Sequence, residues 1–131
     1  SSENDYDSPY KEGLTWYKDL EKAFTISKTT GQPLFVDFTG YTCTNCRWME
    51  VNVFIEPEVK ERFKKMTLVQ LYTDAGPKHK ENQLYEIDRF GTAALPFYVI
   101  LTPEDEIIST FPGMTRKLDD FIDFLDSGLE G

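Results

Sequence analysis

The sequence predicts an α/β fold, a central mixed β-sheet with helices on both faces. Short apolar runs of strand-forming residues alternate along the chain with stretches in which apolar residues recur at helical spacing. The last two strand candidates are joined by the short turn TPEDE, residues 102–106, which makes that pair antiparallel and the sheet mixed.

The first half of the chain gives a helix, a strand and a helix. A helix is expected over 14–30, because apolar residues recur there at nearly helical spacing until Gly31 ends it. The run PLFVDF, residues 33–38, suits a strand that is buried on both faces. After the break TGYT, helical spacing resumes over 43–53.

The second half supplies a short helix, a strand, an amphipathic helix, two strands and a last helix. These elements are expected at 56–66, 67–73, 81–90, 97–101, 107–111 and 118–126. In the third of them, Leu84, Ile87 and Phe90 are predicted to form the buried face. A chain of 131 residues fits one domain. We expect that domain over 13–131, with the polar residues 1–12 as a linker or leader.

Composition limits the possible partners. The formal net charge of −9 argues against nonspecific binding to nucleic acid, which needs clustered lysine and arginine, and against docking on anionic lipid. No apolar run approaches the roughly 20 residues that span a bilayer. We therefore expect a folded monomer with no nucleic-acid partner, either a mature secreted protein or a domain of something larger.

The only two cysteines, Cys43 and Cys46, lie two residues apart where the helix after the buried strand begins. Free amide groups and the helix dipole favour a thiolate at Cys43, which makes it a better nucleophile. Cys46, one turn later, is placed to attack a mixed disulfide formed at Cys43. Two thiols at this spacing can exchange two electrons without any cofactor.

Two other interpretations of the pair are weaker. A closed zinc site needs four ligands, and the single histidine, His79, lies in a distant loop, so we expect no metal. An inert staple is disfavoured because closing so short a loop removes little unfolded-state entropy.

Two acids lie close to the cysteines in the sequence. Asp37 interrupts the apolar strand six residues before Cys43, and burial there would raise its pKa so that it accepts the proton of Cys46. The alternative is an aspartate that points to solvent from an edge strand. Glu50 shares a helix side with both cysteines and would tune the thiols or relay protons with Asp37, or would be an ordinary solvated acid.

Pro96 opens the buried strand FYVIL, where it removes a ladder hydrogen bond. A cis Leu95–Pro96 bond would bend the chain sharply and leave backbone groups for an extended substrate segment.

The stretches PLFVDFTGYTCTNCRWME and TAALPFYVIL resemble the thioredoxin superfamily. With NVFIEPEVKERF and GLTWYKDLEKAF added, the chain from about Gly13 onward is most similar to the C-terminal soluble domain of the thiol:disulfide interchange protein DsbD family. The resemblance implies a thioredoxin fold, Cys43 as attacking thiol, Cys46 as resolving thiol and Pro96 as a cis proline. It also implies Asp37 as the buried acid and Glu50 as a second acid.

In that family the domain takes electrons from a membrane-embedded partner and passes them to another periplasmic domain or to oxidised proteins. The resemblance therefore implies a periplasmic reductase without cofactors. Thioredoxin itself usually has Trp before its first cysteine and Gly-Pro between the two; here Thr42 precedes Cys43, and Thr44-Asn45 intervene. Thr42 removes an aromatic wall from the substrate surface, and Tyr41 is our candidate to replace part of it.

Other functions stay open at this stage. An oxidase or isomerase would use the same chemistry, because direction depends on relative potentials. A non-catalytic thioredoxin-fold module with a dormant disulfide, or a metal chaperone, belongs to a different class. Asp37 and Pro96 beside the cysteines argue against the dormant module, and the scarcity of Met and His there argues against metal handling.

Overall fold

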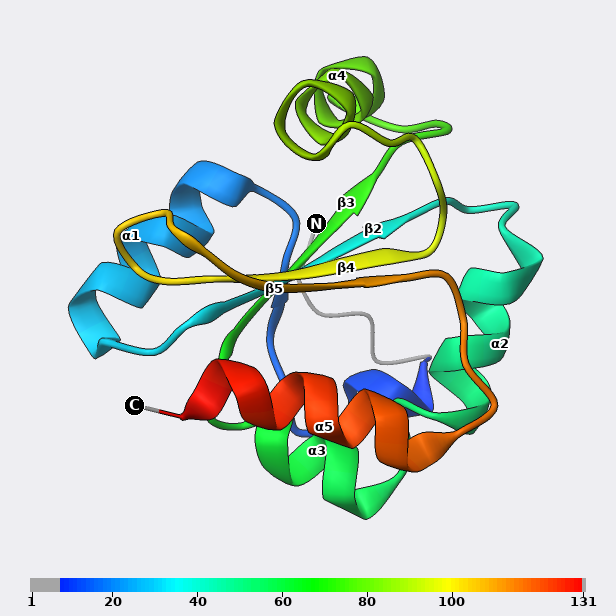
Figure 1. Ribbon diagram of the computed structural model, residues 1–131. Helices are drawn as coiled ribbons and strands as arrows, with labels where there is room; N and C mark the ends of the chain where they lie inside the picture. The colour runs from blue at the N-terminus through cyan, green and yellow to red at the C-terminus, as the bar shows by residue number, and fades with distance from the viewer. Residues whose placement is uncertain (1–7, 131) are drawn as a thin grey trace.

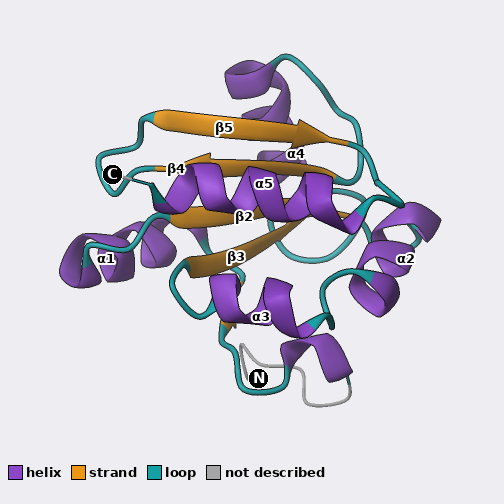
Figure 2. Ribbon diagram, turned by 60° about the horizontal axis from the view of Figure 1, so that its bottom comes forward, coloured by secondary structure: helices purple, strands orange, loops and turns teal. Residues whose placement is uncertain are grey.

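The computed structural model describes residues 8–130, which form a five-stranded sheet with helices on both faces (Figures 1 and 2). The strands are β1 (Trp16–Tyr17), β2 (Leu34–Thr39), β3 (Thr67–Tyr72), β4 (Phe97–Leu101) and β5 (Ile107–Pro112). They lie in the order β1-β3-β2-β4-β5. The first three are parallel to one another, whereas β4 and β5 are antiparallel to their neighbours. The predicted mixed sheet and thioredoxin fold are confirmed.

The helices divide between the two faces of the sheet. They are α1 (Leu20–Thr30), α2 (Thr44–Asn52), α3 (Pro57–Phe63), α4 (His79–Phe90) and α5 (Leu118–Leu129). Helices α1 and α4 lie on one face, and α3 and α5 lie side by side on the other (Figures 1 and 2). Helix α2 follows β2 at the sheet end. None of the helices in residues 8–130 is long and apolar enough to cross a membrane.

Each face of the sheet has its own apolar core. The core under α3 and α5 is rich in aromatic rings, and Trp16 stacks on Phe54 there with ring centroids 5.8 Å apart. The other core, under α1 and α4, contains mostly aliphatic side chains around Phe38. Because β2 lies in the middle of the sheet, all six of its residues are buried, as the continuous apolar run predicts.

The first predicted helix is wrong at its start. Trp16 and Tyr17 form a short strand that pairs with Leu68 and Val69 of β3, and α1 begins only after Asp19. The Asp19 side chain caps α1 by accepting a hydrogen bond from the backbone of Glu21. The local spacing misleads because the fully buried Trp16 packs into the aromatic core instead of lying on a helix face.

The predicted face of α4 is wrong in two of its three residues. Leu84 is 58% exposed and Ile87 40% exposed, while Glu86 is fully buried. The helix contacts the sheet through Tyr85 and Phe90, whose rings lie 5.9 and 5.8 Å from that of Phe38. The spacing of apolar residues locates a helix. It does not decide which side of the helix packs against the sheet when a polar residue such as Glu86 is also buried.

The polar leader predicted over 1–12 is only partly within the described residues. Pro9–Lys11 form a short 3₁₀ helix, η1, and both Tyr10 and Lys11 are buried. Tyr10 belongs to the aromatic core and packs edge-on against Trp16. Tyr10 and Lys11 therefore pack with the folded unit, although they precede the predicted domain start at residue 13. Residues 1–7 lie outside the described part.

Candidate functional site

The two cysteines form a disulfide at the start of α2, as the sequence places them. Cys43 is the N-cap residue, and its sulfur accepts a hydrogen bond from the backbone N–H of Cys46 at 3.2 Å. Cys43 is half-buried, whereas Cys46 is only 2% exposed. A partner can therefore reach the sulfur of Cys43 far more easily than that of Cys46.

The turn before Cys43 is fixed by a residue that the sequence analysis missed. The carboxylate of Asp74 accepts hydrogen bonds from the backbone N–H of Tyr41 at 2.9 Å and of Thr42 at 3.0 Å, and from the Thr42 hydroxyl at 3.1 Å. Burial acts to raise the pKa of Asp74, but the hydrogen bonds from Thr42 and Tyr41 outweigh it and lower the pKa. Asp74 follows strand β3, which ends beside β2. Only the pairing of these two strands could have shown that Asp74 lies next to the turn.

The Leu95–Pro96 peptide bond is cis, as the resemblance implies. Leu95 reaches the turn before the cysteines, because a Cβ on Gly40 would lie 3.1 Å from Leu95 Cδ1. Figure 1 shows the segment that enters β4 running beside the end of β2. The carbonyl of Pro96 accepts the N–H of Gly113 at 2.9 Å, so this carbonyl is already used within the domain.

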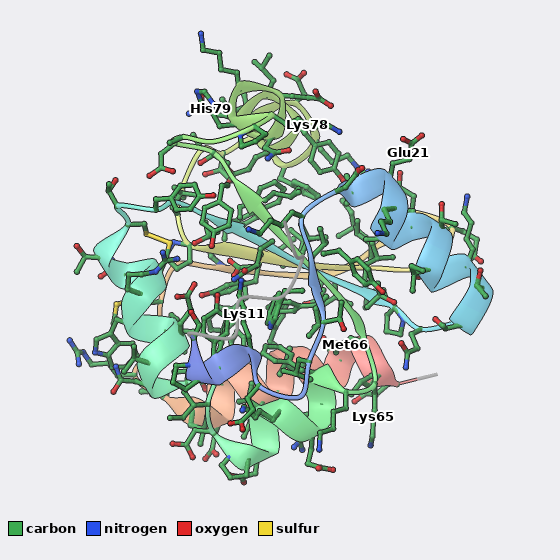
Figure 3. All side chains as sticks on the ribbon, turned by 180° about the vertical axis from the view of Figure 1, so that it is seen from behind. Lys11, Glu21, Lys65, Met66, Lys78 and His79 are labelled. Atoms are coloured by element: carbon green, nitrogen blue, oxygen red, sulfur yellow. A yellow bond between two sulfur atoms is a disulfide. The ribbon has the colours of Figure 1, made fainter. Side chains whose placement is uncertain are left out.

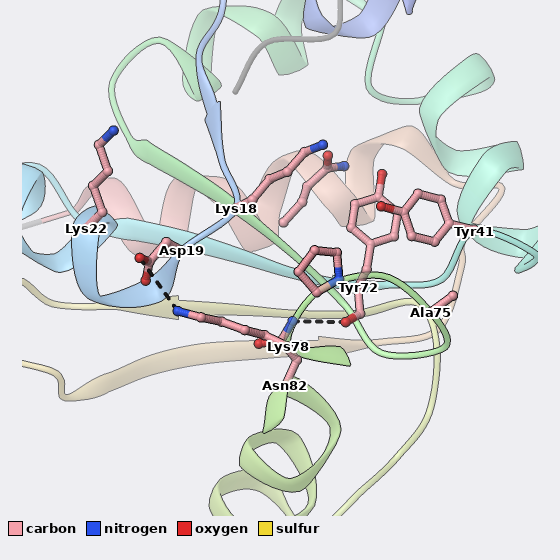
Figure 4. Close-up of a pocket in the computed structure, with 10 residues that line it drawn as sticks. Lys18, Asp19, Lys22, Tyr41, Tyr72, Ala75, Lys78 and Asn82 are labelled. Atoms are coloured by element: carbon pink, nitrogen blue, oxygen red, sulfur yellow. Dashed lines mark hydrogen bonds and ion pairs between the residues drawn. The ribbon is translucent and has the colours of Figure 1, made fainter. Parts of the chain in front are cut away.

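Tyr41 lines a pocket on the α1 and α4 side of the turn (Figure 4). Tyr41 is 47% exposed, and its ring stacks on that of Tyr72 with centroids 4.0 Å apart. The pocket encloses about 370 Å³, and lysines 18, 22 and 78 surround it. In Figure 4, Lys78 pairs with Asp19 across the pocket, with the two charged groups 3.9 Å apart. The exposed aromatic surface at Tyr41 is therefore set in a locally basic rim.

Asp37 is buried, as expected, and only 2% of it is exposed. Its Oδ2 accepts a hydrogen bond from Gln70 Nε2 at 3.0 Å, whereas its Oδ1 has no partner among the described residues. Burial, followed by repulsion from Glu50, raises the pKa of Asp37 to about 7; the hydrogen bond from Gln70 and the charges of Arg47 and Lys11 act in the opposite direction. The carboxyl can therefore accept or release a proton near neutral pH.

Glu50 is also buried, with 7% exposed, so the alternative of an ordinary solvated acid is wrong. Its Oε2 accepts a hydrogen bond from an Arg47 guanidinium N–H at 2.8 Å, and the same nitrogen donates to Thr39 Oγ1 at 3.0 Å. Burial raises the pKa of Glu50, and the charge of Arg47 opposes that change. Because Asp37 and Glu50 act on each other, they form a coupled pair of buried carboxyls.

Sequence reasoning missed the groups that surround this pair. Two of these groups bind the acids directly: Arg47 donates to Glu50, and Gln70 donates to Asp37. Tyr10 binds Gln70, and the charge of Lys11 acts on both acids. The one available signal was the polar Gln70 inside the strand TLVQLYT. In the part of the chain that the structure describes, no cluster of three or more His, Cys, Asp or Glu side chains is arranged to hold a metal ion.

A cysteine pair bonded at a helix start, in a thioredoxin fold, defines the thiol–disulfide oxidoreductases as a class. The chain belongs to the thioredoxin-like family, whose model matches residues 15–103. A comparison with curated protein sequences gives no significant match.

Solved structures show the same fold. The oxidised C-terminal domain of DsbD from Neisseria meningitidis is 19% identical with a TM-score of 0.69, and the match covers 87% of this chain and 99% of that one. A thioredoxin from Thermus thermophilus is 20% identical with a TM-score of 0.69, over 85% and 84% of the two chains. A disulphide isomerase from Xylella fastidiosa Temecula1 is 19% identical with a TM-score of 0.64, over 85% and 88%.

Proposed function

We propose that this chain is a DsbD-like disulfide reductase, which relays electrons to protein disulfides outside the cytoplasm. The observation that carries the proposal is the asymmetric cysteine pair: an accessible Cys43 at a helix N-terminus and a buried Cys46, in a domain that also buries two carboxyls. The Neisseria meningitidis DsbD C-terminal domain, which this chain resembles in fold, is known in both an oxidised and a reduced form.

In the proposed reaction the Cys43 thiolate attacks one sulfur of a substrate disulfide. A mixed disulfide forms, and the first substrate sulfur leaves as a thiolate. Cys46 then loses its proton and attacks the Cys43 sulfur, which releases the second substrate thiolate and leaves the Cys43–Cys46 disulfide. The substrate gains two electrons and the chain loses two. A partner dithiol of lower potential, which we place in a membrane-embedded domain, returns the pair to the reduced form.

We assign the proton of Cys46 to Asp37. A carboxyl with a pKa of about 7 is a matched base for a thiol near neutral pH, and the buried Cys46 has little water available. Glu50 would modulate that base through the repulsion between the two carboxyls.

Substrate binding is proposed at the surface around Cys43. Leu95 and Pro96 would lie along an extended substrate segment, with the Leu95 main chain offered to it. Tyr41 and Thr42, both exposed and held by Asp74, would contact the partner on the other side of the turn.

The two cysteine variants form a matched pair for the test. Cys43→Ser should abolish thiol-dependent reduction of insulin, while Cys46→Ser should accumulate mixed disulfides that a reductant releases. If neither variant behaves in this way, the exchange mechanism is wrong.

The equilibrium potential of the Cys43–Cys46 couple against glutathione decides the direction. A potential well below that of glutathione supports a reductase. A potential near those of strong oxidants instead favours the second candidate, an oxidase or isomerase. The similar fold of the Xylella fastidiosa disulphide isomerase supports that alternative.

A further inference from the structure

The segment η1, Pro9–Lys11, lies before the first residue that the family model matches, yet it enters the interior beneath the site. Tyr10 is 5% exposed and Lys11 only 4% exposed. Figure 3 shows Lys11 between η1 and the sheet. The Lys60 ammonium holds the segment down by donating a hydrogen bond to the carbonyl of Pro9 at 3.1 Å. A buried lysine is costly unless negative groups compensate its charge.

Tyr10 is joined to Asp37 through one buried amide. Gln70 Nε2 donates both to the Tyr10 hydroxyl oxygen and to Asp37 Oδ2, each at 3.0 Å. Both N–H groups of the amide are then used, one on each partner. The Tyr10 hydroxyl in turn donates to Gln70 Oε1 at 3.3 Å, and its presence also acts to lower the pKa of Glu50. Through Gln70 and through its effect on Glu50, Tyr10 therefore connects the two acids.

Lys11 adds the second positive charge. Within residues 8–130, the groups that interact with the Asp37 carboxyl are Gln70 and Tyr72 on β3, Tyr98 on β4, Arg47 and Glu50 on α2, and Tyr10 and Lys11 on η1. Among them, two carboxyls face only two cations, and Lys11 attracts both carboxylates. Removing Lys11 would leave Arg47 alone beside two acids.

We propose that Tyr10 and Lys11 are positioning residues of the exchange site, which hold the buried Asp37–Glu50 pair ready to take the proton of Cys46. This rests on the proposed reductase mechanism. Neither residue touches substrate; both act through the carboxyls. Lys11 acts to lower the pKa of both carboxyls and Tyr10 acts to lower that of Glu50, so losing either one makes the pair hold its proton more tightly. The base form is then reached only at higher pH.

The test follows both sulfurs in one experiment. Reduced protein is mixed in a stopped-flow instrument with excess 5,5′-dithiobis(2-nitrobenzoate), an aromatic disulfide whose thiolate product absorbs visible light. The first thiolate released reports attack by Cys43, and the second reports resolution by Cys46. The rate of each phase is measured from pH 5 to pH 9.

Lys11→Met and Tyr10→Phe should move the pH midpoint of the second phase upward, by about one unit for Lys11→Met. The midpoint of the first phase should stay where it is in the wild type. Lys11→Arg should restore the wild-type profile, because it keeps the charge. Lys64→Met, which removes a lysine that is 58% exposed, is the matched control and should shift neither phase.

An unshifted second phase in both variants would leave Tyr10 and Lys11 as packing residues only and overturn the inference. A wild-type protein that released no second thiolate would instead refute the proposed exchange itself, so the two failures differ. If Lys11→Met does not fold, Tyr10→Phe still decides, because it keeps the ring. NMR titration of the Asp37 and Glu50 carboxyls in the oxidised protein then reads the shift directly, and unchanged titrations would refute the inference.

Discussion

Neutralising Asp37 should stabilise the fold, and the gain should depend on pH in a way that identifies this carboxyl. In the folded protein the pKa of Asp37 is about 7, while the ordinary value of 3.8 applies to the unfolded chain. Below pH 3.8 the carboxyl is protonated in both states and contributes no pH dependence. Between the two values the folded state holds a proton that the unfolded state has lost, so stability falls as pH rises. Above pH 7 the loss is complete.

The size of the loss follows from the two pKa values. A difference of about three pKa units, at about 1.4 kcal/mol for each, corresponds to about 4 kcal/mol. Asp37→Asn lacks this penalty, but its amide would donate into the place of Oδ1, which has no partner among the described residues. An unpaired buried amide costs about 1 to 3 kcal/mol at every pH. The net gain at pH 8.5 should therefore be about 1 to 3 kcal/mol.

Urea unfolding of the oxidised protein at pH 4 to pH 9 measures both the ionisation penalty of Asp37 and the cost of the unpaired amide in Asp37→Asn. The difference in free energy of unfolding between Asp37→Asn and wild type should rise by about 4 kcal/mol across that range, while the constant amide cost cancels. Glu61→Gln, at a carboxyl that is 67% exposed, is the control and should give a flat difference. A flat difference for Asp37→Asn as well would show that this carboxyl titrates normally, and its role as a base would fail with it.

Three further substitutions test other parts of the fold. Glu86→Gln should raise the urea midpoint at pH 9 but not at pH 4, because burial raises the pKa of this carboxyl to about 8 and neither of its oxygens has a partner in the described residues. Gly128→Ala should lower the free energy of unfolding by about 1 to 2 kcal/mol in urea titrations, because its Cβ would lie 2.6 Å from Ile100 Cγ2. Asp74→Ala should cost about 1 to 2 kcal/mol at pH 7 through the lost hydrogen bonds to the turn at Thr42. That cost should shrink as pH falls through the lowered pKa of Asp74, and a cost constant down to pH 2 would contradict it.

Local signals predicted the elements that carry the cysteines, because each of those signals lies within one short stretch. The strand, the turn and the helix start follow one another over residues 34–52, and the buried acid stands out inside an apolar run. The two-residue strand β1 was not predicted, because its partners in β3 are about fifty residues away in the chain. Nothing local marks Trp16 as a strand residue. The same limit hid Asp74, whose bonds to the turn span more than thirty residues.

Long-range contacts explain why the surroundings of the acids were invisible as well. Tyr10 and Gln70 are sixty residues apart in the chain, and the polar composition around Tyr10 suggested a leader. The prediction of the buried face of α4 was wrong for a different reason. Its sequence offers two apolar stripes, one with Leu84 and Ile87 and one with Tyr85, and only tertiary packing chooses between them. Sequence periodicity constrains the helix but not its rotation about its own axis.

Under the proposed mechanism, the different environments of the two sulfurs give a reason for buried acids that weaken the fold. In the proposed exchange Cys43 needs no base, because its place at the N-terminus of α2 would favour the thiolate. Cys46 lies within the first turn and is buried, so its thiol is desolvated and burial opposes its ionisation. A base in the same water-poor interior removes that obstacle only if its pKa is close to neutral. The pKa of an ordinary exposed carboxylate is far lower. If Asp37 is the base that we propose, the free energy that it costs the fold is the same free energy that makes it basic enough to deprotonate Cys46. A variant that removes that cost should then also lose the base.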